Sequence, residues 1–447
     1  MSAVPVTGRS LAFEVLLRVE ADGAFASRAL DAALAQVGAL DPREIGLATE
    51  LTYGTLRRAL SLDAVLAPRS SRPLEKLDPA TRVLLRLGAY QLLHTHVPPH
   101  AAVGETVELA KRHEHGRAAG FVNAVLRALQ RAGAPPPPPD LAVDPVGHVA
   151  AAEALPRWLA GEWVAWLGPE SALSLARGMN QRAPLTIRSP RRDDLLAAAR
   201  AAGLDAAPCR RSPDGLTLSG HSVATLARAA GAIPFQVQDE GAQLTSLLAA
   251  GHLRGQRARV LDTCAAPGGK AFHLAELLGP GSEVVAVELH PRKADLLREE
   301  ARRRGLPVTV ICADAARPLP GLVEGSFDAV LVDAPCAGLG TLRRHPELKL
   351  RREAPDLPRL AALQRDILAG SARYARPGAP VTYAICSLSR AEGPEVVAAA
   401  LAAGWRRDAP PSGLPADVLT PEGDLLTRPD LHGADGFFAA RLVRPIG

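Results

Sequence analysis

Short apolar runs alternate with segments of helical length from about residue 231 to the end of the chain. A short apolar run suits a strand buried on both faces, and a helix-length connection lets the next strand run parallel to it. The alternation therefore predicts a doubly wound, Rossmann-like α/β domain. The predicted strands are Val260-Leu261, Val284 to Val287, Val308 to Ile311, Ala329 to Val332 and Val381 to Ile385, and a last run, Phe437 to Val443, is expected to close the sheet edge.

The N-terminal part carries apolar residues at helical spacing, which predicts an all-α bundle. The clearest stripes are Leu11, Val15, Leu16 and Val19, then Val103, Val107 and Ala110 after Pro98-Pro99, then Val122, Val125, Leu126 and Leu129. We expect the arginines of this part to form solvated helix faces, with contact to RNA as the alternative. They are Arg57, Arg58, Arg82 and Arg86.

A run of five prolines, Pro135 to Pro139, marks a boundary, because such a run enters neither a helix nor a central strand and forms a stiff extended spacer. We therefore predict a helical domain at 1–133, a linker at 134–141, a small α+β module at 142–230 and a catalytic domain at 231–447. Within the module, Leu185-Thr186-Ile187 is strand-like and Asp193 to Ala202 is helix-like.

Composition fits a multidomain globular protein: 447 residues, 47% hydrophobic and 22% charged. The net charge of +5 allows a nucleic-acid partner without requiring one. The first ten residues lack an apolar signal core, and no apolar run is long enough for a membrane helix. Five unevenly spaced cysteines then indicate reduced thiols in the cytoplasm and no metal site, with Cys209 and Cys312 expected to be buried packing residues.

Small and acidic residues stand where four predicted strands end, which is where doubly wound sheets bind ligands. The first strand leads into Asp262 to Lys270, whose small residues admit a ligand and whose following helix N-terminus offers N–H groups to a carboxylate. Glu288 suits ribose hydroxyls, Asp314 an adenine amino group, and Asp333 opens the fourth strand end, Asp333 to Cys336. Each feature alone is most often a turn or a helix cap. Together they predict a nucleotide-type site, and the absence of G-x-G-x-x-G spacing makes a nicotinamide dehydrogenase a distant alternative.

Several strings resemble the RNA cytosine-5 methyltransferase family, RsmB/NOP, over nearly the whole chain. They are DTCAAPGGK, DAPCAG at Asp333 to Gly338, YAICSLSRAEG at Tyr383 to Gly393, RRHPELK at Arg343 to Lys349, FQVQDEGAQL at Phe235 to Leu244 and HGADGFFAARL at His432 to Leu442. LTYGTLRRALSLD, LRLGAYQLL, PPHAAV and FVNAVLRAL look like the NusB-like domain of its bacterial 16S rRNA branch, also called Sun/Fmu. The chain departs from the family pattern at Ile385, Ala271, Glu288 and Ala379-Pro380.

The resemblance implies S-adenosyl-L-methionine as cofactor and 16S rRNA as partner, for a protein that we expect to be monomeric. The implied cofactor contacts are Cys264, Ala265, Ala266, Pro267, Gly268, Gly269, Lys270, Glu288, Asp314 and Asp333. It also implies Cys386 as the nucleophile that adds to carbon 6 of cytosine and Cys336 as the helper in adduct breakdown, with Asp333 at N3. A thiolate suits this chemistry because it is both a strong nucleophile and a competent leaving group.

Three alternatives remain open. A DNA cytosine-5 methyltransferase uses a Pro-Cys nucleophile like Pro335-Cys336, but it has no counterpart of Cys386 and carries a large target-recognition insertion. Amino-group methyltransferases have an aromatic residue where Cys336 stands. A non-catalytic RNA-binding regulator fits the N-terminal domain. The basic residues after the fourth strand end are expected to meet RNA phosphates, with a solvated segment as the alternative; they are Arg343, Arg344, Lys349, Arg351 and Arg352.

Overall fold

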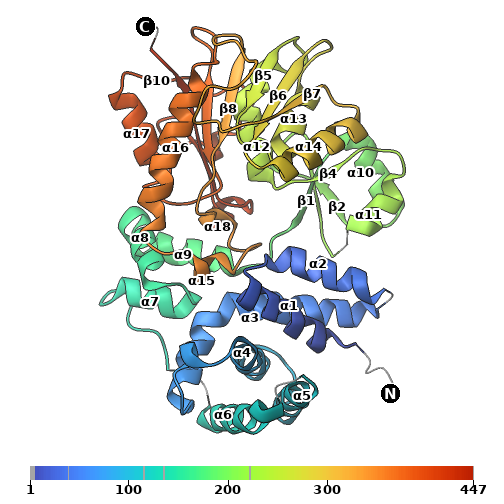
Figure 1. Ribbon diagram of the computed structural model, residues 1–447, viewed down its shortest axis with the longest axis vertical. Helices are drawn as coiled ribbons and strands as arrows, with labels where there is room; N and C mark the ends of the chain where they lie inside the picture. The colour runs from blue at the N-terminus through green and yellow to red at the C-terminus, as the bar shows by residue number, and fades with distance from the viewer. Residues whose placement is uncertain (1–5, 39, 114–115, 134–135, 221–222, 446–447) are drawn as a thin grey trace. The chain divides into compact units, whose positions relative to one another are not determined.

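The computed structural model describes residues 6–445 apart from 39, 114–115, 134–135 and 221–222, and these residues form two compact units (Figure 1). The first unit is Met1–Asn180 together with Leu342–Arg351, and the second is Gln181–Thr341 with Arg352–Gly447. A segment from late in the chain therefore completes the first unit. The domain boundaries that we expected stay predictions, because compactness groups residues without marking where a domain ends.

The described part of the first unit consists of helices and their connections. The α-helices are α1 Gly8–Asp22, α2 Ala26–Val37, α3 Pro42–Leu66, α4 Pro79–His94, α5 Pro99–Arg112, α6 Ala119–Ala132, α7 Pro145–Glu153, α8 Arg157–Leu167, α9 Pro169–Asn180 and α15 Leu348–Arg351. Three short 3-10 turns, η1 Ala67–Arg69, η2 Leu74–Lys76 and η3 Gly116–Ala118, join them. The local sequence determines where some of these helices start. Asp41 caps the N-terminus of α3 and Asp78 caps that of α4, and a proline follows each cap. Pro136–Asp140 has no regular structure, as expected for the spacer.

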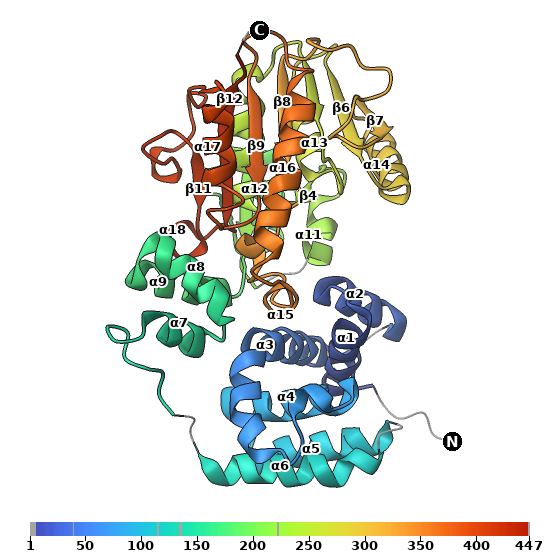
Figure 2. The same ribbon diagram turned by 60° about the vertical axis from the view of Figure 1, so that its left-hand side comes forward.

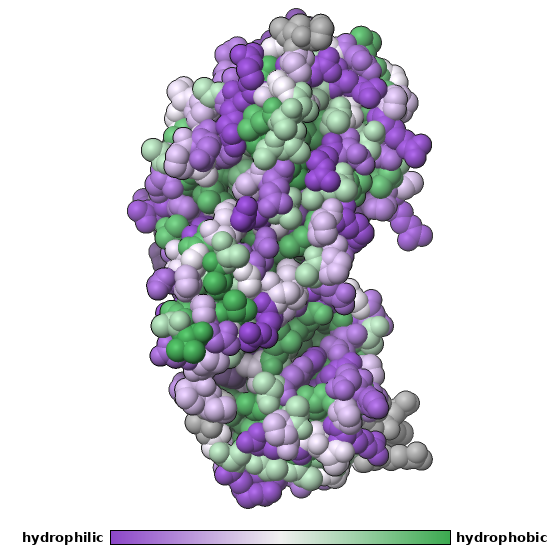
Figure 3. Space-filling view, turned by 90° about the vertical axis from the view of Figure 1, so that its left-hand side faces the viewer, coloured by the Kyte–Doolittle hydropathy of each residue, from purple (hydrophilic) through white to green (hydrophobic). Residues whose placement is uncertain are grey.

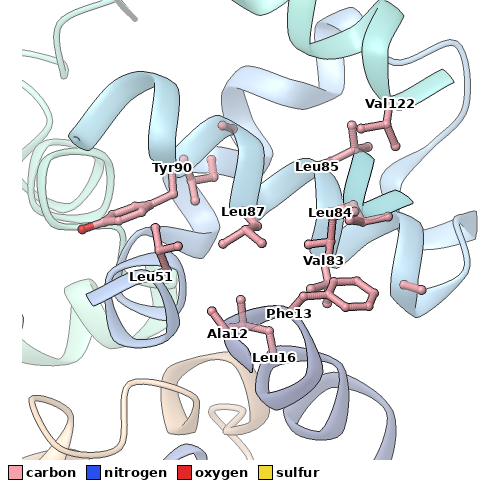
Figure 4. Packing of buried hydrophobic residues seen from close by; sticks show 14 of the residues in the cluster. Ala12, Phe13, Leu16, Leu51, Val83, Leu84, Leu85, Leu87, Tyr90 and Val122 are labelled. Atoms are coloured by element: carbon pink, nitrogen blue, oxygen red, sulfur yellow. The ribbon is translucent and has the colours of Figure 1, made fainter. Parts of the chain in front are cut away.

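The predicted helical stripes form the core of this unit (Figure 4). Phe13 and Leu16 of α1 pack among Leu51 of α3 and Val83 and Leu87 of α4. Every stripe residue is buried apart from Val107, which is partly buried. Helices α7 to α9 also group with this unit.

The four arginines of the helical part do not form solvated faces, so that expectation is wrong. Arg86 binds Asp63 and Glu20 at 2.7 and 3.0 Å, and Arg82 also binds Glu20, with only 12% and 18% of the two arginine side chains exposed. Arg57 and Arg58 donate to the carbonyl oxygens of Arg343 and Ala152. These arginines lie where helices meet, and a charge in such a place must be paired.

Residues 342–351, which we call the inserted segment, bind both ends of the turn between α1 and α2. Glu347 Oε1 accepts from the N–H of Ala26, 3.1 Å away, at the start of α2, where the N-cap residue Phe25 supplies no side-chain cap. Arg351 donates to the carbonyl oxygens of Val19, Gly23 and Ala24 at the end of α1. A carboxylate at a helix N-terminus and a guanidinium at a C-terminus both complement the helix dipole.

Burial overturns the RNA-phosphate expectation for Arg343 and Lys349, whereas for Arg344, Arg351 and Arg352, which are half-buried, it stays a prediction. Arg343 and Lys349 are 4% and 2% exposed, and Glu347 is fully buried. Lys349 Nζ donates to the carbonyl of Arg57, and burial together with the charges of Arg58 and Arg57 lowers the Lys349 pKa to about 7. These side chains are used to hold the segment and are not presented to a ligand.

The second unit begins with a small antiparallel sheet of order β2-β3-β1-β4. Its strands are β1 Leu185–Arg188, β2 Ala206–Pro208, β3 Gly215–Leu218 and β4 Gln236–Val237, and its helices are α10 Arg192–Ala201 and α11 Val223–Ala230. The predicted strand and helix of the α+β module are confirmed in β1 and α10.

The large sheet has the order β10-β12-β9-β8-β5-β6-β7, with β11 paired to β12. Its strands are β5 Arg259–Asp262, β6 Glu283–Glu288, β7 Val308–Cys312, β8 Ala329–Asp333, β9 Val381–Ile385, β10 Arg406–Arg407, β11 Leu425–Thr427 and β12 Phe437–Val443. Neighbours among β5 to β9 are parallel, and β12 is antiparallel to β9. The Rossmann-like prediction is confirmed. The expectation that 437–443 closes the edge is wrong, because β10 lies outside it.

Successive residues of the strands point to opposite faces of the large sheet, and apolar side chains cover both faces. One face packs on α16 Asp356–Ala372 and α17 Pro394–Ala402 through residues such as Val332 and Tyr383 (Figure 2). The other packs on α12 Glu240–Ala250, α13 Gly269–Leu277 and α14 Pro291–Arg304 through residues such as Leu331. The remaining short elements are η4 Gly251–Leu253, η5 Leu339–Thr341, η6 Ala416–Val418 and α18 Pro429–His432.

Within the described residues no helix is long and apolar enough to cross a membrane. On the face shown in Figure 3, hydrophilic and hydrophobic residues are interspersed. The same residues contain no group of three or more His, Cys, Asp or Glu side chains arranged to hold a metal ion.

Candidate active site

Strand register brings the expected site residues to one edge of the large sheet. Asp262 pairs with Leu331, Glu288 with Cys312 and Asp333 with Ala384, so the carboxyl ends of β5 to β9 lie together. This is the edge at which doubly wound sheets bind ligands.

The loop after β5 makes a tight turn into α13. Ala265 N donates to Val287 O at 2.9 Å, and Gly268 N donates back to Ala265 O at 2.7 Å, so backbone bonds fix the path from Cys264 through Ala266 and Pro267. Gly268 has φ +106, and a Cβ there would lie 2.5 Å from the Phe272 ring. Only glycine fits this position, and the loop leaves the N-terminal N–H groups of α13 at the ligand edge, beginning with Gly269.

Asp262, which ends β5, is a feature that the sequence did not single out as a site residue. It is fully buried, and its Oδ2 has no hydrogen-bond partner among the described residues. Burial, helped by the charge of Asp333, raises the pKa of Asp262 to about 7. An orphaned buried carboxyl at this edge fits a ligand that brings a cationic or hydrogen-bond-donating group. Its signal in the sequence was its place at the head of DTCAAPGGK.

Glu288 and Asp314 follow β6 and β7 and are held by short turns. Glu288 is 7% exposed, and its Oε1 accepts from the N–H of His290 at 2.9 Å. Asp314 accepts from the N–H of Ala316 at 3.0 Å and lies 3.4 Å from the Arg317 guanidinium. Both carboxylates are thus oriented by the backbone at the ligand edge.

Lys270 and Asp333 form an ion pair across the site. Lys270 Nζ donates to Asp333 Oδ2 at 2.7 Å and lies 4.9 Å from the centre of the Phe437 ring. Burial alone would lower the pKa of Lys270, but the charge and hydrogen bond of Asp333 outweigh it and raise the pKa. The amine is therefore a cation held beside the carboxylate.

The two cysteines that the resemblance singled out are in contact. Cys336 Sγ and Cys386 Sγ lie 3.4 Å apart, and both are free thiols. The backbone fixes their loops to each other, because Gly340 N donates to Cys386 O at 3.0 Å and Ala334 N to Ala384 O at 2.9 Å. The hydrogen bond to Cys386, burial, and the charges of Cys386 and Glu392 raise the pKa of the Cys336 thiol well above its ordinary value.

Three further side chains surround the cysteine loops and were not singled out from the sequence: Glu392, Gln364 and Ser387. Glu392 stands inside the YAICSLSRAEG string, which was its only sequence signal. Nothing in the sequence marked Gln364, in the middle of α16, as part of the site.

The other cysteines lie apart from this pair. Cys209 is buried as expected, whereas Cys312 is exposed, so the packing expectation is wrong for that residue. Cys312 is the last residue of the edge strand β7. Cys264 is partly buried within the loop after β5.

Comparison with known proteins gives two family matches. Residues 253–443 match the family described as 16S rRNA methyltransferase RsmB/F. Residues 7–131 match the NusB family.

Several relatives match this chain over nearly its whole length. Ribosomal RNA small subunit methyltransferase B of Pseudomonas syringae pv. tomato is 35% identical over 419 residues, which cover 92% of this chain and 91% of that protein. The protein of that name from Vibrio cholerae is 33% identical and covers 98% and 97%. A Mycobacterium tuberculosis protein, whose assigned name mentions a methyltransferase and no substrate, is 40% identical and covers 98% and 96%.

Solved structures share the fold. The crystal structure of PH0851 has a TM-score of 0.83 at 21% identity and covers 99% of this chain and 100% of that chain. NSun6 from Pyrococcus horikoshii has a TM-score of 0.54 at 18% identity and covers 66% and 100%.

Proposed function

Because the chain belongs to the RsmB/F family of 16S rRNA methyltransferases and carries a NusB-family domain, we propose that it methylates carbon 5 of a cytosine in 16S rRNA. The methyl donor in this proposal is S-adenosylmethionine. The observation that carries the cytosine-5 chemistry is the contact between two thiols, 3.4 Å apart, beside the Lys270–Asp333 ion pair.

The residues at the ligand edge suit this donor, which supplies a methyl group from a positively charged sulfur. The buried, unpartnered Oδ2 of Asp262 can accept a hydrogen bond from an ammonium group. The N–H groups at the start of α13 can receive a carboxylate. Glu288 and Asp314 can take ribose hydroxyls and an adenine amino group, and the turn at Gly268 lets a ligand approach the backbone.

Cys386 is proposed as the nucleophile. Its thiolate forms a bond to carbon 6 of the cytosine, and the ring electrons move toward carbon 5 and N3, so that carbon 5 becomes able to accept the methyl group. Asp333 is proposed to act at N3 as a carboxylic acid, which gives its proton to the nitrogen as negative charge develops there and is left as the carboxylate beside the Lys270 cation.

Cys336 is proposed to assist the last step. After methylation the proton on carbon 5 leaves to a base, the bond between carbon 6 and Cys386 breaks, and its electrons restore the ring double bond. Cys336 lies against Cys386 and is therefore close to this reaction. The second thiol distinguishes this arrangement from a DNA cytosine-5 methyltransferase, which was expected to need only the Pro-Cys thiol.

A trapping experiment tests the assignment. Cys336→Ala protein is incubated with S-adenosylmethionine and small-subunit rRNA and run on a denaturing gel. We expect an RNA-linked protein band, because adduct breakdown is impaired while adduct formation is not. The band should disappear when Cys386→Ala is added to the same protein, since no thiolate then attacks the ring.

The matched control is Cys312→Ala, which removes an exposed thiol outside the site and should give wild-type turnover and no band. Full turnover by Cys336→Ala would contradict the assignment of the two thiols. A wild-type protein that methylates no RNA and binds no S-adenosylmethionine in calorimetry would support the RNA-binding regulator instead.

A further inference from the structure

One buried carboxylate outside the catalytic groups contacts the loops of both cysteines. We propose that Glu392 is a positioning residue, whose buried carboxylate holds the two thiols of the active site in their working arrangement and sets a negative charge beside Cys336. The inference rests on the proposed roles of Cys336 and Cys386, and it adds a residue to which no role is otherwise assigned.

Each oxygen of Glu392 serves a different cysteine loop. Oε1 accepts from the N–H of Ala337, the residue after Cys336, at 2.8 Å. Oε2 accepts from the hydroxyl of Ser387, the residue after Cys386, at 2.6 Å. The side chain is fully buried, so water does not compete for these bonds.

Gln364 of α16 extends the same network to the other side of Cys336. Its Nε2 donates to Glu392 Oε1 at 3.0 Å and to the carbonyl of Pro335 at 2.9 Å. Its Oε1 accepts from the hydroxyl of Tyr383 at 3.0 Å, and that hydroxyl also donates to the Glu392 carbonyl. The backbone is therefore held both before and after Cys336, and one carboxylate ties this loop to the residue beside Cys386.

A purely structural role is the competing explanation for such a network. A fully buried carboxylate is costly unless its hydrogen bonds compensate, and Glu392 accepts from three donors. Glutamine has nearly the same shape and can keep the bonds from Ala337 and Gln364 while its amide donates to the Ser387 oxygen. Replacement by glutamine therefore removes the charge with little change in packing, which separates the two explanations.

The negative charge of Glu392 acts on Cys336 together with the other groups that face this thiol. These other groups are Cys386 at the end of β9 and Tyr383 within β9, while Lys270 and Asp333 stand on the Cys386 side of the site. Arg352 also donates to the carbonyl of Ala337, and its charge acts on Glu392. Burial raises the pKa of Glu392 despite these hydrogen bonds, and the negative form in turn raises the pKa of Cys336. This favours a neutral Cys336.

The test measures thiol reactivity in the full-length protein without RNA or cofactor. Cys336 and Cys386 are alkylated with iodoacetamide across a pH series, and each modified peptide is quantified by mass spectrometry. In Glu392→Gln we expect the alkylation profile of Cys336 to move to lower pH, because the neighbouring negative charge is gone. With RNA present, kcat should fall about tenfold or more while KM for S-adenosylmethionine stays within about twofold.

Two further variants provide controls. Asp424→Asn removes another buried carboxylate of the same unit, 2.9 Å from Arg407, and should leave both alkylation profiles and kcat unchanged. Ser387→Ala removes one of the three bonds and keeps the charge, so it should lower kcat less than Glu392→Gln and leave the Cys336 profile in place.

An unchanged Cys336 profile in Glu392→Gln would overturn the proposal, as would wild-type kcat in that variant. If Glu392→Ala fails to fold, the glutamine variant still decides. Failure of the proposed function would look different: the wild-type protein would form no methylated rRNA, whatever the alkylation profiles.

Discussion

Asp262 ends β5 without a partner for one of its oxygens, and its pKa is raised to about 7 by burial and then by Asp333. In the unfolded chain the same carboxyl ionises near its ordinary pKa of about 4. Between these two values the folded protein holds a proton that the unfolded chain has lost. The contribution of Asp262 to stability therefore falls as the pH rises from about 4 to about 7.

Asp262→Asn should remove this loss. We expect the variant to gain stability over wild type as the pH rises from 5 to 8, by at most roughly 3 kcal/mol, because about two of the three pKa units of the shift lie in this interval. Urea unfolding of both proteins at the two pH values measures the difference. Asp424→Asn, which breaks an ion pair with Arg407, should be less stable than wild type at both. If the free energies of unfolding of Asp262→Asn and wild type differ by the same amount at both pH values, the prediction is contradicted.

The sequence was enough to bring three candidate site residues to one edge of the sheet, because strand order alone decides their position. Glu288, Asp333 and Cys386 lie at the end of a strand or just after it, and parallel strands bring these ends together. Their roles stay predictions. Glu392 was not predicted as a site residue, because its partner Ala337 lies 55 residues away in the sequence and the two residues meet only in the folded protein. The ion pair of Lys270 with Asp333 was not predicted either, because 63 residues separate the two in the sequence.

Among the secondary-structure elements, the inserted segment differs most from its predicted role. Its arginines and lysine were expected to contact RNA phosphates, because a run of basic residues is usually exposed to solvent and therefore open to a ligand. The structure uses two of its charges as caps: Glu347 at the start of α2 and Arg351 at the end of α1. Neither cap is visible in the sequence, because local patterns show capping only within a few residues of a helix end. The six strands predicted for the large sheet, whose apolar runs are local, agree with β5 to β9 and β12 to within one residue at each end, whereas β10 and β11 were not predicted.

Glu347→Ala should destabilise the first unit. The change leaves the N–H of Ala26 without its acceptor and empties a fully buried position, and we expect a loss of about 1 to 3 kcal/mol. Urea unfolding monitored by circular dichroism measures the loss. Glu353→Ala, an exposed glutamate just beyond the segment, is the control and should change stability by less than about 0.5 kcal/mol. Equal stability of the two variants would show that Glu347 is not a working cap.

At the scale of the whole molecule, the first unit is discontinuous in sequence, since Met1–Asn180 is joined by Leu342–Arg351. The proline run suggested a simple order of domains along the chain, and a local signal of that kind cannot reveal a later segment that returns to an earlier unit. The helical fold itself was predictable, because its stripes lie within single helices.

A fragment of residues 1–180 should therefore be folded but less stable than the unit in the intact chain. We expect a synthetic peptide of residues 342–351 to raise the urea midpoint of this fragment in a concentration-dependent way, because the peptide binds the folded form only. The same peptide with Glu347 changed to Ala should raise it less. A peptide without any effect would mean that the segment is held by its covalent connections and not by its contacts.

The late position of the inserted segment in the sequence also determines when the first unit can be completed during synthesis. A ribosome completes residue 351 about 170 residues after residue 180, which at roughly 5–20 residues per second takes on the order of ten to thirty seconds. During that interval helix α1 of the nascent chain lacks the hydrogen bonds that Arg351 donates to its C-terminal end, and helix α2 lacks the acceptor that Glu347 supplies at its N-terminal end. The N-terminal unit is then folded without these two contacts and is less stable, and it is completed only after the loop of Cys336, which precedes the segment, has been made.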